Sequence, residues 1–85
     1  MLENDKALHD RLARAEGQIR GIGRMLDEGR TCEDIVTQLL AVRTAIERIA
    51  SEVVTAHIDE CLATLPPEEA RRTIGRAIKT LAHLD

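Results

Sequence analysis

Two residues near the middle of the chain, His57 and Cys61, have the types and the spacing that suit metal binding. They lie in the stretch AHIDEC, residues 56–61. In a helix, residues four apart share one face about one turn apart, so an imidazole and a thiolate would be neighbours there. Both groups are good ligands for soft metal ions. Two ligands leave a site incomplete, and the chain's other cysteine is Cys32.

These residues must also be weighed against plainer roles. A lone His on a helix is usually a surface or packing residue, and a lone Cys usually behaves as a small buried hydrophobe. As ligands, two thiolates and one imidazole suit Cu(I) in a three-coordinate site. Zn(II) would need a fourth donor, for which the chain offers Asp59, Glu60, His9 and His83. We find no nucleophile–base set, phosphate loop or paired carboxylates, and therefore predict that the protein is not an enzyme.

Size and composition indicate one small domain, residues 1–85, that needs partners. The chain has 85 residues, no Trp, Tyr or Phe, and a net charge of -3. Its core must therefore be built from Leu, Ile, Val and Ala. A monomer of this size buries only about 60–65% of its unfolded surface, and oligomerisation is the usual remedy. The net charge gives no overall positive field, so the distribution of charge matters more than the total.

The sequence also predicts a cytoplasmic protein. No apolar run approaches the ~18 residues of a membrane span, and the polar, acidic start MLENDKALHD does not resemble a signal peptide. In the cytoplasm two cysteines are normally reduced thiols. A Cys/His set there indicates a metal site or a reactive thiol rather than a disulfide.

The elements that position these residues are predicted to be three helices, with no strand. Apolar residues recur at steps of four and three in the first segment, at Leu8, Leu12, Ala15, Ile19, Ile22 and Leu26. Asn4 or Asp5 can cap its start, and Gly29 can end it. The glycines inside it indicate either close helix packing or the close approach of another backbone or a phosphate; they are Gly17, Gly21 and Gly23.

The second helix is predicted to be long. Thr31 and Asp34 resemble a capping box, no Gly or Pro occurs from Cys32 to Leu65, and Pro66 then stops the helix. About 33 residues correspond to ~50 Å. Its apolar stripe consists of Ile35, Leu39, Val42, Ile46, Ile49 and Val53. A third helix should start at Pro67, and its apolar face consists of Ala70, Ile74, Ala77, Ile78 and Leu81.

The length of the second helix predicts an antiparallel dimer with a four-helix core, because two shorter neighbours cannot cover its whole stripe. Cys32 precedes His57 by 25 residues, or roughly 37 Å along one helix. Metal–ligand bonds are only about 2.0–2.3 Å long, so one chain cannot bring both residues to one ion. In an antiparallel dimer, Cys32 of one chain can meet His57 and Cys61 of the other, giving two equivalent sites.

Residues 11–49, RLARAEGQIRGIGRMLDEGRTCEDIVTQLLAVRTAIERI, resemble the copper-sensitive operon repressor family. The resemblance extends from about Ala7 to Leu84, and HIDEC at 57–61 is among its most specific marks. It implies an all-α fold that assembles as a dimer of dimers, a homotetramer. It also implies a repressor that binds double-stranded operator DNA and releases it when an inducer binds. The Cys32, His57, Cys61 pattern matches the copper branch, in which the third ligand comes from the partner subunit, and so implies Cu(I).

Two positions depart from the copper branch. A Tyr usually precedes its first Cys, where this chain has Thr31, and a Glu on the third helix usually links to the ligand His, where this chain has Arg76 and Ala77. The residues that usually orient the imidazole are therefore absent. Other branches match less well. A persulfide sensor would not need His57, His9 does not match the additional ligand position of the nickel/cobalt branch, and Leu2 replaces the Pro of the formaldehyde branch.

The sequence also offers basic residues for DNA. Residues 6–24 carry five basic side chains against two acidic ones, and Arg43 and Arg48 add to them from the second helix. The resemblance points to Arg11 and Arg48 as contacts, and we add Lys6 and Arg14. The plain alternative is a solvated helix face with ordinary ion pairs. Contacts from a tetramer should be mainly to phosphate and sensitive to salt. Two further classes stay open, namely a thiol or persulfide sensor and a metal-binding helical bundle without DNA activity.

Overall fold

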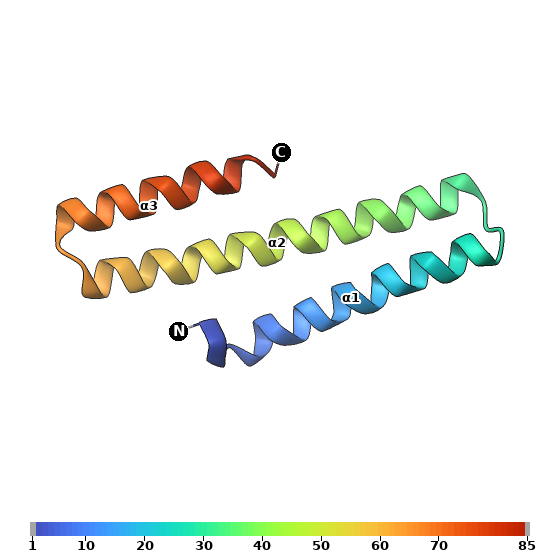
Figure 1. The fold of residues 1–85 in the computed structure, drawn as a ribbon, viewed down its shortest axis with the longest axis horizontal. Helices are drawn as coiled ribbons and strands as arrows, with labels where there is room; N and C mark the ends of the chain where they lie inside the picture. The colour runs from blue at the N-terminus through green and yellow to red at the C-terminus, as the bar shows by residue number, and fades with distance from the viewer. Residues whose placement is uncertain (1, 85) are drawn as a thin grey trace. The chain divides into compact units, whose positions relative to one another are not determined.

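The structure is a computed structural model that describes residues 2–84, and these residues form helices and no strand. A short 3-10 helix, η1 (Leu2–Asn4), is followed by α1 (Lys6–Asp27), α2 (Cys32–Thr64) and α3 (Pro67–Ala82). Figure 1 shows the three α-helices in this order along the chain. The predicted all-α fold of three helices is confirmed, and α2 has the 33 residues expected from its sequence.

The turn between α1 and α2 follows from two residues that the sequence singled out. Gly29 has a φ of +68°, a conformation that a residue without a Cβ adopts at little cost. Its N–H donates to the carbonyl of Leu26 and the N–H of Arg30 donates to the carbonyl of Met25, which is the bond pair of a Schellman motif. Thr31 then caps α2, since its Oγ1 accepts the N–H of Asp34 at 3.1 Å.

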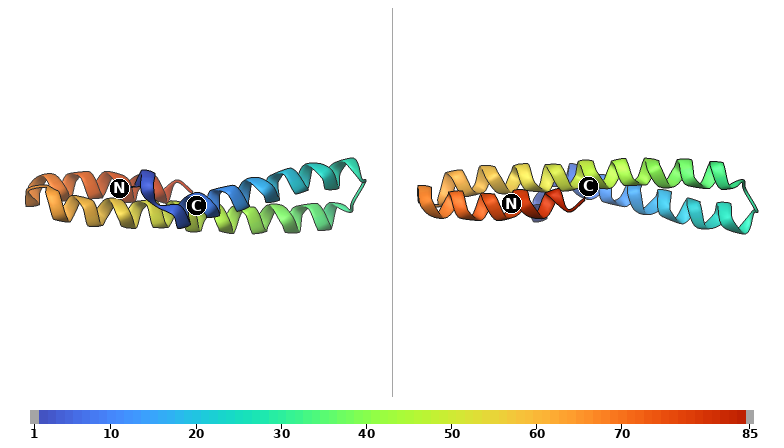
Figure 2. Two further views of the ribbon diagram at one scale, coloured as in Figure 1. Left: turned by 90° about the horizontal axis from the view of Figure 1, so that it is seen from below. Right: turned by 90° about the horizontal axis from the view of Figure 1, so that it is seen from above.

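The chain divides into two compact units, and α2 contributes to both. The first unit, Lys6–Ile49, is a helical hairpin of α1 and the first half of α2, which lie side by side in Figures 1 and 2. Its buried residues are Leu8, Ala15 and Ile22 from α1 and Val42 and Ile49 from α2. We call this unit the N-terminal hairpin.

The second unit consists of residues 50–84 together with residues 2–5, and we call it the C-terminal hairpin. In it α3 packs beside the second half of α2 (Figure 2). Cys61 and Ala70 are its buried residues, at 3% and 4% exposure. Pro67 begins α3, and Glu68 and Glu69 lie in its first turn, where the helix dipole favours negative charge. The predicted start of the third helix is confirmed.

Only half of the predicted apolar stripe is buried within the N-terminal hairpin. On α1 the buried residues alternate with exposed ones, and Leu12, Ile19 and Leu26 are 49%, 52% and 63% exposed. On α2 Leu39 and Ile46 are 49% and 41% exposed. Leaving so much aliphatic surface in water is unfavourable. The unburied half is available for contact with a second chain, and the dimer itself stays a prediction.

The glycines of α1 do not mark close packing within this chain. A Cβ added at Gly17 or Gly23 would meet nothing within 4 Å, and one at Gly21 would meet only the side chain of Arg24. The described part of this chain therefore supplies no close neighbour at these positions, and packing against a helix of another chain stays a prediction, as does the close approach of another backbone or a phosphate. Within the chain, α2 covers a different face of α1, the one that carries Ala15 and Ile22.

Candidate metal and nucleic-acid-binding sites

The predicted pair of metal ligands is brought together near the end of α2. The sulfur of Cys61 lies 3.5 Å from Nε2 and 3.8 Å from Nδ1 of His57. The thiol is buried and the imidazole is half-buried. The four-residue spacing on a regular helix gives this contact directly.

The distance between these two atoms fits a shared metal ion. Bonds of about 2.3 Å to sulfur and about 2.0 Å to nitrogen, about 120° apart, place the two ligand atoms about 3.7 Å from each other. A tetrahedral angle gives about 3.5 Å and a linear arrangement about 4.3 Å from the same bond lengths. The observed 3.5–3.8 Å is thus short enough for Cys61 and one ring nitrogen of His57 to bind one ion, and it is also the distance of an ordinary thiol–imidazole contact.

The third predicted ligand, Cys32, lies elsewhere. It is the first residue of α2, carries a free thiol and is exposed. Within residues 2–84, no three His, Cys, Asp or Glu side chains are grouped closely enough to hold a metal ion. Of the conceivable fourth donors, Asp59, Glu60 and His9 are exposed. A metal site with three protein ligands would therefore need one ligand in addition to His57 and Cys61, and a second chain could supply it.

The surroundings of His57 come from α3. An apolar groove of about 550 Å³ between the second half of α2 and α3 is lined by His57, Val53, Ala77, Thr80 and Leu81, and also by His83 at the C-terminal end of α3. The Thr80 hydroxyl donates to the carbonyl of Arg76 at 3.0 Å. Its oxygen still has lone pairs that can accept a ring N–H. Arg76 itself is exposed and has donors only.

Thr80 is a residue that the sequence reasoning missed. It lies on α3 close to the position where the copper branch has its Glu. The sequence shows that Thr80 is one helical turn after Arg76. Whether Thr80 faces the groove that His57 lines depends on how α3 is rotated against α2. The other candidate, Thr31, is exposed at the start of α2 and already accepts a backbone N–H in the helix cap.

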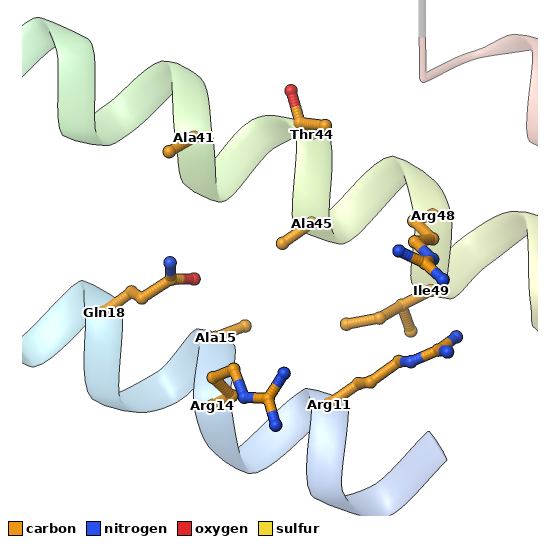
Figure 3. A pocket seen from close by; sticks show the side chains of 9 residues that line it. All are labelled: Arg11, Arg14, Ala15, Gln18, Ala41, Thr44, Ala45, Arg48 and Ile49. Atoms are coloured by element: carbon orange, nitrogen blue, oxygen red, sulfur yellow. The ribbon is translucent and has the colours of Figure 1, made fainter. Parts of the chain in front are cut away.

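Three of the four predicted DNA contacts gather in one groove of the N-terminal hairpin. Arg11 and Arg14 from α1 and Arg48 from α2 line a groove of about 240 Å³. In Figure 3 the side chains of Arg11 and Arg48 extend toward the same end of this groove. Its floor is small and apolar, with Ala15 and Ala45. Three guanidinium groups that line one concave surface make it positively charged, and such a surface attracts anions. We call this surface the arginine groove.

Two polar residues that the sequence reasoning did not select also line the arginine groove. They are Gln18 on α1 and Thr44 on α2 (Figure 3). Gln18 follows Arg14 by one turn and Arg11 by two, so helical spacing could have revealed it. An amide donates hydrogen bonds to phosphate oxygens or to base edges.

The fourth predicted contact, Lys6, lies outside the arginine groove. It is exposed and its Nζ is 2.9 Å from Oδ2 of Asp10. Other basic residues of the same hairpin are also paired with a carboxylate one turn away, Arg20 with Glu16 and Arg43 with Glu47. Such exposed pairs contribute little to stability. Lys6, Arg20 and Arg43 therefore look like ordinary ion-paired residues of a solvated helix face, which was the alternative to DNA contacts.

Residues 4–84 match the family model described as metal-sensitive transcriptional repressor. The chain belongs to this family. It is therefore a metal-sensing transcriptional repressor, and its family consists of regulators rather than enzymes. The resemblance seen in the sequence is confirmed.

Relatives within the family are named for two metals. The chain is 42% identical over 72 residues to the copper-sensing transcriptional repressor RicR of Mycobacterium tuberculosis, covering 85% of this chain and 75% of that protein. It is 41% identical over 54 residues to the copper-sensing repressor CsoR of Bacillus subtilis, covering 64% of this chain and 54% of that one. A solved structure, the nickel-responsive transcriptional regulator InrS, aligns with a TM-score of 0.84 and 32% identity over 92% of each chain.

In the described part of the chain, no helix combines the length and the apolar character that crossing a bilayer needs.

Proposed function

We propose that this metal-sensitive repressor binds double-stranded operator DNA and releases it when Cu(I) binds between two protomers. Cys32 of one protomer and His57 and Cys61 of the other would supply the ligands, giving two sites in each antiparallel dimer. The observation that carries this proposal is the half-buried His57–Cys61 pair at metal-sharing distance, with the remaining thiol exposed at the other end of the same helix.

The donor set favours Cu(I). Two thiolates and an imidazole are soft donors, and three of them suffice for Cu(I). The copper-sensing relatives are the more similar ones in sequence. Bound Cu(I) would link the two protomers through its bonds to their side chains. The protein's own residues would hold and orient those ligands. His57 and Cys61 are held by helix spacing, and Cys32 is presented by the capped first turn of α2.

Nickel is the second candidate, because the InrS structure shares the fold over most of the chain. Ni(II) takes more ligands than Cu(I) and prefers nitrogen and oxygen donors. A Ni(II) sensor would therefore have to recruit His9, His83 or a carboxylate, and a persulfide sensor would need Cys32 and Cys61 without His57.

On the DNA side, the arginine groove carries the proposal. Arg11, Arg14 and Arg48 would bind phosphate oxygens, with Lys6 nearby in sequence as a weaker contact, since it must give up Asp10. A homotetramer would repeat the groove four times, which offsets the net charge of -3 on each chain. Such a regulator acts on DNA in the cytoplasm.

The decisive experiment is complementation between two defective chains. Cys32→Ser and His57→Ala should each reduce Cu(I) affinity by orders of magnitude, measured by competition with a Cu(I) chelator. Mixed heterodimers should regain one tight site, because one chain still has Cys32 and the other still has His57 and Cys61.

The matched control is a mixture of His57→Ala and Cys61→Ser chains. Both lack the same half of the site, so no combination is complete and tight binding should stay absent. Equal failure of both mixtures would disprove the site between protomers. Parallel titrations with Ni(II) and Zn(II), followed by DNA binding, identify the inducer. Duplexes that the wild-type protein selects from a random-sequence library serve as operator DNA.

A further inference from the structure

A second group of basic side chains lies on α3, on the face opposite the one that packs in the C-terminal hairpin. Arg72, Arg76 and Lys79 follow each other at steps of four and three, and all three are exposed. At 3.6 residues per turn they fall within an arc of about 60°. The opposite side of α3 carries the buried Ala70 and the half-buried Leu81. We call these three residues the α3 basic stripe.

The charge of the C-terminal hairpin is strongly segregated. All Lys and Arg residues after Ile49 occur between Arg71 and Lys79, and no Asp or Glu occurs from Ala70 to Leu84. Arg71 lies off the stripe and its Nε is 3.8 Å from Oε2 of Glu68. Within the described residues, the side chains of the stripe make no hydrogen bond or ion pair.

A solvated helix face normally looks different. Several basic residues of the N-terminal hairpin are paired with a carboxylate four positions away, as in Arg30–Asp34 and Arg43–Glu47. In the stripe, by contrast, each cation has another cation three or four residues away, an arrangement that destabilises a helix. An anionic partner that spans several turns would reverse this cost.

We propose that the α3 basic stripe is a second contact surface for the phosphate backbone of operator DNA, made of different residues from the arginine groove. It rests on the DNA-binding part of the proposed function. A duplex fits better than a membrane, because among the described residues of α3 the only large apolar side chain that is strongly exposed is Ile78, whereas an inserting helix needs a continuous apolar face. A linear array of charges without aromatic or amide groups suits phosphates, which supply half or more of protein–DNA hydrogen bonds.

The test compares two variants that remove the same charge. In Arg72→Gln/Arg76→Gln/Lys79→Gln the stripe is neutralised. In Arg30→Gln/Arg43→Gln/Arg71→Gln three exposed cations with carboxylate partners are removed instead. Affinity for a duplex selected by the wild-type protein is measured from 50 to 200 mM salt, and circular dichroism confirms that both variants are helical.

We expect the slope of log K against log [salt] to fall by about 0.9 for each phosphate that the stripe variant no longer neutralises. In the control variant the slope should change by less than this amount. Arg72→Lys/Arg76→Lys should keep the wild-type slope, because binding to phosphate needs charge rather than a planar fork. Cu(I) affinity should be the same in all of them.

Three results would overturn the proposal. One is an unchanged slope in the stripe variant, and another is an equal decrease in the control, which would indicate a general field effect. The third is binding to anionic phospholipid vesicles that the stripe variant loses while its DNA slope stays unchanged. If Arg11→Ala abolishes DNA binding while the stripe variant keeps it in full, only this surface is wrong. If the wild-type protein binds no DNA at low salt, the proposed function fails as well.

Discussion

The imidazole of His57 and the thiol of Cys61 meet because the two residues are four positions apart on a helix. This part of the site could be predicted from the sequence alone, since it needs only helical periodicity. The surroundings of the imidazole could not, because they depend on the rotation of α3 against α2. Thr80 and Ala77 reach the His57 groove through that packing. In the arginine groove, Thr44 is placed by the packing of α1 on α2, whereas the spacing of Gln18 from Arg14 was already visible in the sequence.

Thr80 is expected to couple metal binding to α3. If its oxygen accepts the ring N–H of His57, Thr80→Val should leave Cu(I) affinity within a few-fold of wild type. The Cu(I)-induced decrease in operator affinity should become smaller, starting from a wild-type value near the low end of about 5–150-fold. Thr80→Ser, which keeps the hydroxyl, should retain the wild-type ratio. DNA-binding titrations with and without Cu(I) measure it, and an unchanged ratio in Thr80→Val would assign the acceptor role to another group, such as Thr31 or water.

Arg11 and Arg48 are expected to act on DNA and not on the metal. Replacing either by Gln should lower operator affinity and reduce the salt slope by about 0.9 for each phosphate that is no longer neutralised. Cu(I) affinity should hardly change. Arg43→Gln is the matched control, because Arg43 pairs with Glu47 instead of lining the arginine groove. Undiminished operator binding by both variants would rule out the arginine groove as the DNA surface.

At the scale of the elements, the turn at Gly29 offers a sharp test of backbone strain. Gly29 has φ +68°, so Gly29→Ala should lower the free energy of unfolding by about 1 kcal/mol. Gly23 lies inside α1 with open space around it, so Gly23→Ala should raise that free energy by about 0.5–1 kcal/mol. Urea unfolding followed by circular dichroism distinguishes them. If both substitutions changed the free energy of unfolding in the same direction, the φ angle of the glycine would not determine the effect.

The helix boundaries were predictable because their signals are local. Thr31 as a cap, Gly29 as a C-terminal residue and the pair Pro66–Pro67 act within a turn of where they stand. The sequence could not tell which half of the α1 stripe would be buried within one chain, since Leu8 and Leu12 are equally apolar. Only the packing of α1 on α2 determines that Leu8 is buried and Leu12 is exposed. Ion pairs such as Lys6–Asp10 were hidden for a similar reason, because spacing permits a pair without requiring it.

At the scale of the whole molecule, the exposed apolar residues of the N-terminal hairpin are expected to hold two chains together. Leu39→Glu would place a carboxylate in that surface, and burying it without a partner costs several kcal/mol. The variant should be monomeric at micromolar concentration in analytical ultracentrifugation, and its Cu(I) affinity should fall because Cys32 has no partner chain. Gln38→Glu adds the same charge at an exposed neighbouring position and should stay oligomeric. A dimeric Leu39→Glu protein would place the interface elsewhere.

The half-exposed apolar stripe also has a genetic consequence. Leu12, Ile19 and Leu39 are exposed on the surface that we expect to form the dimer. Because this surface is identical in wild-type and Cys32→Ser chains, the two kinds of chain should pair with each other as readily as with themselves. In a cell that expresses equal amounts of wild-type protein and Cys32→Ser, random pairing makes about half of the dimers mixed, with one complete site of two, and about a quarter with none. Such an allele should be dominant, and a reporter in a merodiploid strain should stay repressed at copper levels that derepress the wild type.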